Sequence, residues 1–190
     1  FFKADVVDVE LLYDNAMIAV NYNLARRFNI KHILAGTNRA TEGVPMPKDW
    51  NWFKFDRKNI KSIVKSYNGP KFKTMPTFGV ITYIMDTYVR KIKWIDFLDY
   101  FDYTKNSALE VLVKDFHYKP YPYKHYESVF TRFYQGYILP NKFGIDKRIN
   151  HLCAEVLNGD LSKNKAIKML DESPYSSGQN LDLDKKYFIK

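Results

Sequence analysis

The predicted fold depends first on residues 31–43, which read KHILAGTNRATEG. An apolar run, Ile33 to Ala35, stops at Gly36 and is followed by small and polar residues. Open α/β sheets bind ligands outside the carboxyl ends of their strands, so the pattern is typical of a ligand site. Gly36 would let a ligand approach the backbone closely, and Glu42 supplies a carboxylate for Mg²⁺ or an amine. A strand end with a polar turn and no ligand explains the same residues equally well.

A helix is predicted immediately before this strand, because apolar residues between 11 and 28 recur at helical spacing. They are Leu11, Leu12, Ala16, Val20, Leu24 and Phe28. A helix, a short link and a buried strand make half of a βαβ repeat, which predicts a parallel sheet. Only one repeat is in view, so we expect most of the sheet to precede Phe1. An apolar surface should then be exposed where the rest of the sheet belongs.

The remaining elements are predicted from periodicity, caps and breakers. A short strand or strand end is expected at 5–10, and a proline-rich aromatic loop at 44–55. This loop is either a hydrophobic plug or a lid over a ligand, and the plug is narrowly favoured. Helices are expected at 56–67, 78–90, 108–116, 124–139, from 142–148 to 157, and 162–170, with a strand at 91–95. Residues 173–190 are expected to be a tail with little core.

Composition indicates one domain, or one domain with an appendage, in 190 residues. A hydrophobic content of 46% is ample for a core. The single cysteine, Cys153, excludes an internal disulfide framework and a cysteine-cluster zinc site, and it fits a reducing cytoplasm. We expect its thiol to be packed within a helix. No apolar run approaches the roughly 20 residues of a membrane span.

The net charge of +9 favours polyanionic partners such as nucleic acid, anionic lipid or phosphorylated small molecules. The basic residues are spread along the chain without an arginine-rich arm. A solvated basic face is the simplest interpretation of most of them.

Several common catalytic motifs are absent from the sequence: HxxxH pairs, GxSxG, the Walker P-loop and GxGxxG. One polar group could carry chemistry on the helix predicted at 124–139. Its positions 124, 127, 131 and 135 would share a face, with two cations downstream. Such a face could clamp phosphate oxygens and sugar hydroxyls, but a surface helix with an i,i+4 network is the open alternative. The group comprises Lys124, His125, Glu127, Thr131, Arg132 and Gln135, followed by Lys147 and Arg148.

Four segments of the chain resemble the N-acetyl sugar amidotransferase family. They are GTNRATEG (36–43), KFKTMPT (71–77), DYFDYTK (99–105) and, most specifically, KHYESVFTRFYQGYILPNKFGIDKR (124–148). This family belongs to the PP-loop ATP pyrophosphatases. The resemblance therefore implies an α/β fold: part of a doubly wound parallel sheet, of the adenine nucleotide α-hydrolase type, followed by a mainly helical C-terminal region.

The resemblance implies an enzyme that converts an acetamido group of a nucleotide-activated sugar to acetamidino in lipopolysaccharide O-antigen or related surface glycan synthesis. ATP with Mg²⁺ would adenylylate the amide oxygen, and ammonia would then displace AMP. The ammonia would come from a glutaminase and cyclase-like partner pair. The implied location is the cytoplasm, and nucleic acid is not an expected partner.

The resemblance also assigns roles to residues. The positions near the nucleotide follow a looser likeness of GTNRATEG to NAD synthetases. The expected catalytic residues are Lys124, Glu127, Lys147 and Arg148; the expected cofactor-binding residues are Gly36, Thr37, Asn38 and Thr41; the expected substrate-binding residues are Lys73, Thr74, His125, Thr131 and Gln135; the expected metal ligand is Glu42.

Two departures from the family matter. Its SGGxDS pyrophosphate-binding element and its N-terminal cysteine motifs are absent, so we expect Phe1 to lie in the middle of a longer enzyme and this chain to be inactive alone. The family usually has Gly-Gly where Pro122-Tyr123 precede Lys124 here, which argues against close approach of a ligand at that loop. The expected division is 1–55 for the C-terminal half of the PP-loop nucleotide-binding fold, 56–172 for a helix-rich substrate region and 173–190 for a tail.

Two rival functions fit the sequence. A PP-loop tRNA-modifying enzyme would use the basic surface and would bind RNA with a steep salt dependence. A non-catalytic basic aromatic module would bind nucleic acid or glycan; the lack of an arginine-rich patch counts against it, and binding of a nucleotide would distinguish it from the enzyme.

Overall fold

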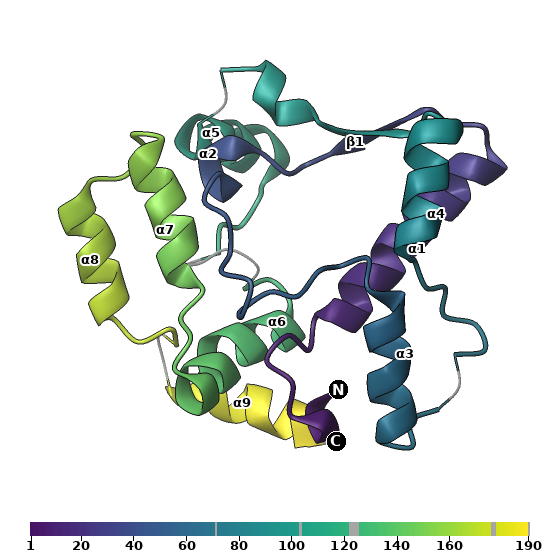
Figure 1. Cartoon of the computed structure of the whole chain (residues 1–190). Coiled ribbons are helices and arrows are strands. Elements are labelled where there is room, and N and C mark those ends of the chain that lie inside the picture. Colours follow the sequence, from purple (N-terminus) through teal and green to yellow (C-terminus); the bar gives the residue numbers. More distant parts are fainter. Residues whose placement is uncertain (71, 103, 122–125, 176–177, 190) are drawn as a thin grey trace. The chain divides into compact units, whose positions relative to one another are not determined.

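The computed structural model describes residues 1–70, 72–102, 104–121, 126–175 and 178–189, and these are mostly helical (Figure 1). Their only strands are β1 (His32–Ala35) and β2 (Lys93–Asp96), which pair in parallel with Ala35 opposite Asp96. The predicted doubly wound sheet is therefore wrong for the described chain. Each strand spans four residues; β2 is followed directly by a helical turn, whereas three residues separate β1 from the next helix. Residues 5–10, expected to be a strand, lie in the turns between η1 (Phe2–Ala4) and the first long helix.

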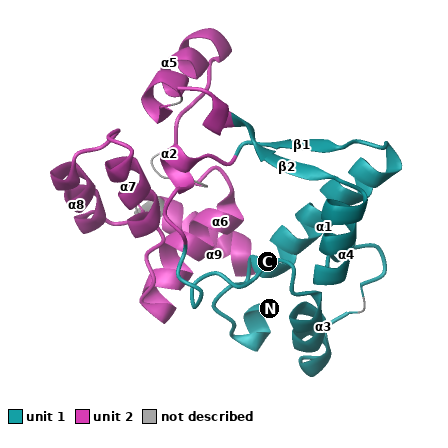
Figure 2. Cartoon of the chain, turned by 45° about the horizontal axis from the view of Figure 1, so that its top comes forward, with its two compact units in different colours: residues 1–36, 46–97 teal, residues 37–45, 98–190 magenta. Residues whose placement is uncertain are grey.

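The chain forms two compact units, coloured separately in Figure 2. Unit 1 contains Phe1–Gly36 and Met46–Phe97, and unit 2 contains Thr37–Pro45 and Leu98–Lys190. The chain therefore passes from one unit to the other three times. No helix among the described residues is long and apolar enough to cross a membrane.

Unit 1 is built on a core of three α1 side chains, Ala19, Tyr22 and Ala25, with Phe78 and Ile92. The rings of Tyr22 and Phe78 stack with their centroids 4.6 Å apart. Besides η1 and the two strands, its elements are α1 (Leu11–Arg27), α3 (Arg57–Ser66), α4 (Val80–Ile84) and the π-helix η2 (Met85–Val89), which continues α4.

Helix α1 forms where it was predicted, but a different face is buried. The buried positions are Leu11, Asn15, Ala19, Tyr22 and Ala25. Three of the residues expected to define the apolar face, Val20, Leu24 and Phe28, are exposed. On β1, Leu34 is also exposed, in agreement with the apolar surface expected beside the sheet.

A polar residue, Asn15, fixes the position of α1 within unit 1. Its amide donates to the carbonyl oxygens of Lys54 (2.7 Å) and Phe78 (2.8 Å), and its Oδ1 accepts from the backbone N–H of Phe78 (2.9 Å). The side chain is fully buried, so these bonds replace water at three backbone groups. Asn15 thereby joins α1 to the loop that carries Lys54 and to the start of α4.

The aromatic loop at 44–55 contributes to the core of unit 1 through Phe55, whose ring lies 4.6 Å from that of Tyr83 and 5.7 Å from that of Phe78. Trp52 and Phe53 in the same loop remain exposed. Asp56 then caps α3 by accepting from the N–H of Asn59, at the start of the helix predicted at 56–67.

Among its described residues, unit 2 contains helices joined by loops and no strand. Its elements are α2 (Arg39–Glu42), η3 (Phe97–Tyr100, whose first residue belongs to unit 1), α5 (Lys105–Phe116), α6 (Val129–Phe133), the π-helix η4 (Tyr134–Phe143), α7 (Arg148–Leu157), α8 (Lys163–Asp171) and α9 (Gly178–Ile189). Residues 173–190, expected to be a tail, include α9, which packs on α6 through Phe188.

The continuous helix α6–η4 starts later and ends later than predicted. Ser128 caps it by accepting from the N–H of Thr131, and Gly144 ends it with a φ of 65°. Pro140 lies inside the helix, in the wider π-helical turns. A proline has no N–H to donate, and irregular helical turns accommodate that loss.

Candidate functional site

The segment that follows β1 folds into a capped turn of helix. Asn38 Oδ1 accepts from the backbone N–H of Thr41 (2.9 Å) and from its hydroxyl (3.1 Å), and both side chains are buried. These two predicted cofactor-binding residues therefore form the N-cap of α2. Gly36 and Thr37 are exposed, and a side chain at Gly36 would meet nothing within 4 Å. Glu42, the predicted metal ligand, is exposed at the end of α2.

Helix α7 is the element that holds α2, Pro45 and α5 together in unit 2. α2 packs against it, and the Asn150 amide of α7 donates to the carbonyl of Pro45 (2.9 Å). On α5, the Lys105 ammonium is 2.7 Å from the Glu155 carboxylate of α7. Residues separated by about 100 positions in the sequence are thus held together by one helix.

Arg148, a predicted catalytic residue, lies in the first turn of α7 and is buried. Its Nε and Nη2 bind the carboxylate of Asp146, at 3.0 and 2.7 Å. Its remaining donors reach three backbone carbonyls at the end of α8, those of Met169 (3.0 Å), Leu170 (3.3 Å) and Glu172 (2.9 Å). The guanidinium therefore caps the carbonyl end of α8 and joins it to the start of α7.

Lys147, the adjacent predicted catalytic residue, is only 5% exposed. Its ammonium lies 5.4 Å from the centre of the Tyr134 ring on η4, a cation–π contact that is strengthened by burial. The two neighbouring cations thus have different surroundings: Lys147 faces η4, and Arg148 faces α8.

The polar face predicted for positions 124–135 is only partly helical. Glu127 is exposed in the turn before α6, Thr131 is half-buried on α6, and Gln135 is buried on η4. Only the last two share a helix face. Lys124 and His125 lie outside the described residues. Lys73 and Thr74 are exposed in the loop between α3 and α4, in unit 1.

An ion-pair cluster between α6 and α9 was not predicted. Arg132 donates from Nε and Nη2 to the two oxygens of Asp184, at 2.7 and 2.6 Å, and from Nη1 to the carbonyl of Tyr126 at 3.2 Å. The hydroxyl of Tyr175 donates to Asp184 at 2.9 Å. Asp184 is only 3% exposed, so its charge depends on these donors.

The hydrogen bonds set the protonation of this cluster. Burial alone would raise the pKa of Asp184, but the donors Arg132 and Tyr175 outweigh it and hold that pKa below its ordinary value. Burial, together with the neighbouring carboxylate, raises the pKa of the Tyr175 hydroxyl. The carboxylate is therefore ionised and the phenol protonated at neutral pH. The spacing of Leu181, Asp184 and Phe188 is the helical signal that could have revealed α9.

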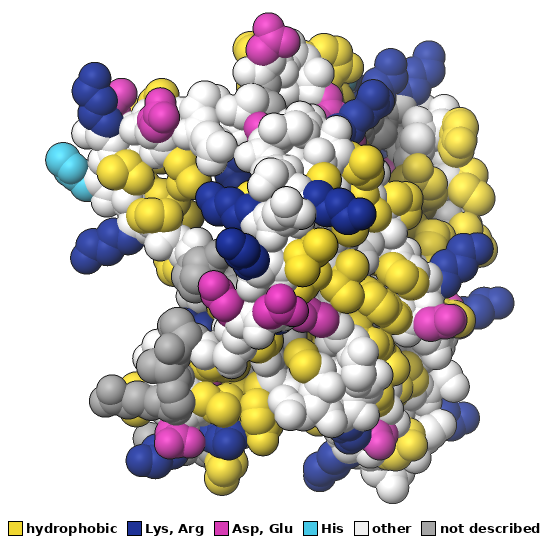
Figure 3. Space-filling view, turned by 90° about the vertical axis from the view of Figure 1, so that its left-hand side faces the viewer, with side chains coloured by type: hydrophobic (Ala, Val, Ile, Leu, Met, Phe, Trp, Pro, Cys, Tyr) yellow, Lys and Arg dark blue, Asp and Glu magenta, His cyan; other side chains and the backbone are white. Residues whose placement is uncertain are grey.

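The described part of the chain offers few side chains for metal binding or thiol chemistry. It contains no group of three or more His, Cys, Asp or Glu side chains that could hold a metal ion. Cys153, expected to be packed, is exposed on α7. On the face shown in Figure 3, Lys and Arg side chains lie among acidic and apolar ones, as expected for a solvated basic surface.

The comparison with protein families finds a match in the C-terminal third of the chain. No curated protein and no solved structure matches the chain significantly. Residues 127–190 match the family model described as "LPS biosynthesis protein WbpG-like, C-terminal domain". The match begins just before α6 and contains α7, α8 and α9, with both arginine clusters. The similarity supports a role in lipopolysaccharide biosynthesis.

Proposed function

We propose that this chain acts in the ATP-dependent conversion of an acetamido group to an acetamidino group on a nucleotide-activated N-acetyl sugar, during lipopolysaccharide biosynthesis. The observation that carries the proposal is the match of residues 127–190 to the C-terminal domain of a lipopolysaccharide biosynthesis family. The resemblance of residues 124–148 to the N-acetyl sugar amidotransferases supplies the reaction. The net charge of +9 suits a substrate with a diphosphate.

Within unit 2, we assign binding of the nucleotide sugar to the start of α6. Glu127 is exposed there, and Thr131 lies one helical turn further on and is half-buried. A carboxylate and a hydroxyl in this arrangement can accept and donate hydrogen bonds to sugar hydroxyls. The Arg132–Asp184 pair has a supporting part, because it fixes α9 against α6, the helix that carries Thr131; Arg148 joins α8 to the start of α7.

The described residues do not form a complete Mg²⁺ site, since Glu42 is a single exposed carboxylate and no metal-binding group includes it. Asn38 and Thr41 are used in the cap of α2. The described residues therefore give no Mg²⁺ ion a role in this chain. ATP would supply adenylylation of the amide oxygen, and ammonia would come from a glutaminase and cyclase-like partner pair.

Calorimetric titration of the chain with UDP-N-acetylglucosamine tests the proposal. Separate titrations with ATP·Mg²⁺ and with tRNA, each at two salt concentrations, test the rival functions. We expect saturable binding of the UDP-sugar that is weakened by Glu127→Ala. The matched control is Glu110→Ala, which removes an exposed carboxylate from α5. Absence of UDP-sugar binding together with tight, salt-sensitive tRNA binding would replace the proposal by the RNA-modifying alternative.

A further inference from the structure

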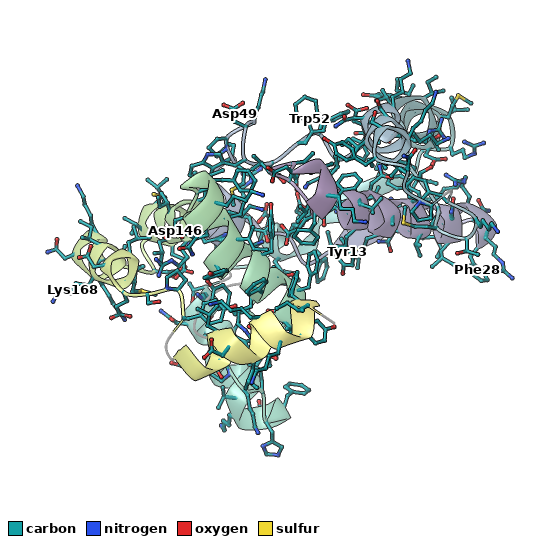
Figure 4. The ribbon with its side chains drawn as sticks, turned by 90° about the horizontal axis from the view of Figure 1, so that it is seen from below. Tyr13, Phe28, Asp49, Trp52, Asp146 and Lys168 are labelled. Atoms are coloured by element: carbon teal, nitrogen blue, oxygen red, sulfur yellow. The ribbon has the colours of Figure 1, made fainter. Side chains whose placement is uncertain are left out.

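We propose that the outer face of α1 is a self-association surface, which pairs with the same face of a second copy so that the two helices run antiparallel. The outer face consists of Tyr13, Met17, Val20, Leu24 and Phe28, whose exposed fractions lie between 43% and 66%. Figure 4 labels Tyr13 and Phe28 near the two ends of the helix.

The spacing of the outer face is that of a helix-pairing seam. From Tyr13 to Leu24 the intervals are four, three and four residues, which is the alternation of a and d positions in a heptad. Successive members of such a series lie on one stripe of the helix and meet a partner helix crossing at a small angle. α1 has 17 residues and is therefore long enough for about two heptads.

Apolar side chains on both sides of α1 indicate that the outer face also has a cover. The face turned into unit 1 buries Leu11, Asn15, Ala19, Tyr22 and Ala25. The outer face carries large apolar groups as well, such as Met17 and Leu24, and these are exposed. A helix that is apolar on both sides is characteristic of a helix buried on both sides. Contiguous exposed apolar surface of this kind marks an interaction site.

The charges at the two ends of α1 favour a second copy as the partner. At the start, the single ammonium of Lys54 lies 2.8 Å from both Asp8 and Asp14, which leaves a net negative charge. At the end, Arg26 and Arg90 share the one buried carboxylate of Asp86, which leaves a net positive charge.

The exposed Arg27 adds to the positive charge at the end of α1. A parallel pair would bring like charges together, whereas an antiparallel pair joins opposite ones and opposes the two helix dipoles.

A two-fold axis beside Val20 pairs apolar residues with apolar residues and places opposite charges together. Residues whose numbers are equally far from the axis then face each other, so that Met17 lies opposite Leu24 and Tyr13 opposite Phe28. The same symmetry places Asp14 of one copy near Arg27 of the other. The surface is thus self-complementary, as an isologous interface requires.

Sedimentation velocity over a range of chain concentrations tests the proposal. We expect a reversible monomer–dimer equilibrium, and Leu24→Glu should raise the dimer dissociation constant about 100-fold or more, because each copy would bury an unpaired carboxylate. The matched control is Leu157→Glu on α7, where the leucine is also exposed; it should leave the equilibrium unchanged. A wild-type chain that remains monomeric throughout, or a dimer equally insensitive to both substitutions, would overturn the proposal.

Cysteine cross-linking tests the antiparallel geometry independently. In a Cys153→Ser background, copies carrying Met17→Cys should cross-link to copies carrying Leu24→Cys about tenfold faster than to each other, because proximity sets the effective concentration of the thiols. Val20→Cys should cross-link with itself. Equal rates for all combinations, or preferred Met17→Cys self-pairing, would contradict the antiparallel arrangement. The intact tryptophan fluorescence of unit 1 would show that each variant is folded.

Discussion

Arg132 of α6 and Asp184 of α9 form a two-point ion pair, with nitrogen–oxygen distances of 2.7 and 2.6 Å across 52 residues of sequence. Paired bonds of this kind fix the orientation of both side chains as well as their distance. With the ring contacts of Phe188 on Phe130 and Phe133, the pair attaches the last helix to α6 within the region that matches the lipopolysaccharide family model.

Asp184→Asn should detach α9 from α6. The amide keeps the shape of the carboxylate but loses the charge that binds Arg132, and we expect a loss of about 2–3 kcal/mol of stability in unit 2. Hydrogen–deuterium exchange should rise in α9 and in α6. Asp182→Asn, on an exposed position of the same helix, is the control and should leave the exchange unchanged. Unchanged exchange in both variants would mean that apolar packing alone holds α9.

The same pair predicts a pH dependence. The pKa of Asp184 is lowered from 3.8, so the carboxylate stabilises the fold above that value, and the contribution is lost as the pH falls below 3.8 through the folded-state pKa. Urea unfolding followed by circular dichroism should show a constant difference between wild type and Asp184→Asn from pH 7 to about pH 5. The difference should shrink at pH 3. A difference that grows in acid would have the wrong sign for this mechanism.

Arg148→Lys should loosen the end of α8 although the charge is kept. An ammonium cannot reproduce the planar fork that binds Asp146 and the carbonyls of Met169 and Glu172, and we expect a loss of about 2–3 kcal/mol. Exchange protection across α8 is the measurement. Arg39→Lys makes the same change at a side chain that is 89% exposed and should have little effect. If Arg148→Lys abolished UDP-sugar binding without altering α8, direct contact of Arg148 with the substrate would be favoured.

Asn15→Ala should destabilise unit 1. The substitution leaves the N–H and C=O of Phe78 and the carbonyl of Lys54 without their partner, at a cost of about 3 kcal/mol. All three tryptophans belong to unit 1, so urea unfolding followed by tryptophan fluorescence reports on this unit alone. Asn21→Ala, which removes an exposed amide from the same helix, should change the midpoint only slightly.

Gly136→Ala should destabilise unit 2 even though alanine favours helices. A β-carbon there would lie 2.7 Å from the hydroxyl of Tyr126 and 3.2 Å from the ring of Tyr175, and both tyrosines are buried. We expect a net loss of about 1–3 kcal/mol, measured by thermal unfolding. Gly36→Ala is the control, since its β-carbon would meet no atom within 4 Å. A stabilised Gly136→Ala would show that the two rings can move aside.

Features that depend on neighbouring residues were predictable from the sequence. Asp56, Thr104 and Ser162 each cap the helix that follows them, because a short polar side chain satisfies free N–H groups three residues away. The strands near residues 33 and 93 were also predicted. Their periodicity and caps are local properties of the chain.

Features that depend on distant residues were not predictable. The extent of the sheet is set by strand pairing, which periodicity does not encode. The buried face of α1 is set by the backbone groups that Asn15 meets 39 and 63 residues away, and the Asp184 site by an arginine 52 residues away. The roles predicted for Glu127, Thr131 and Lys147 remain predictions, whereas Asn38 and Thr41 are seen to form a cap.

The chain crosses between unit 1 and unit 2 three times, and this limits how the two units can be studied separately. No single cut separates the units, because unit 2 consists of Thr37–Pro45, which contains α2, and of the chain from Leu98 onward. A truncation at residue 98 would strip α7 of the helix packed on it and of the Pro45 carbonyl that Asn150 binds. Isolating that half would require grafting residues 37–45 onto its new end through a linker, or adding them as a separate peptide.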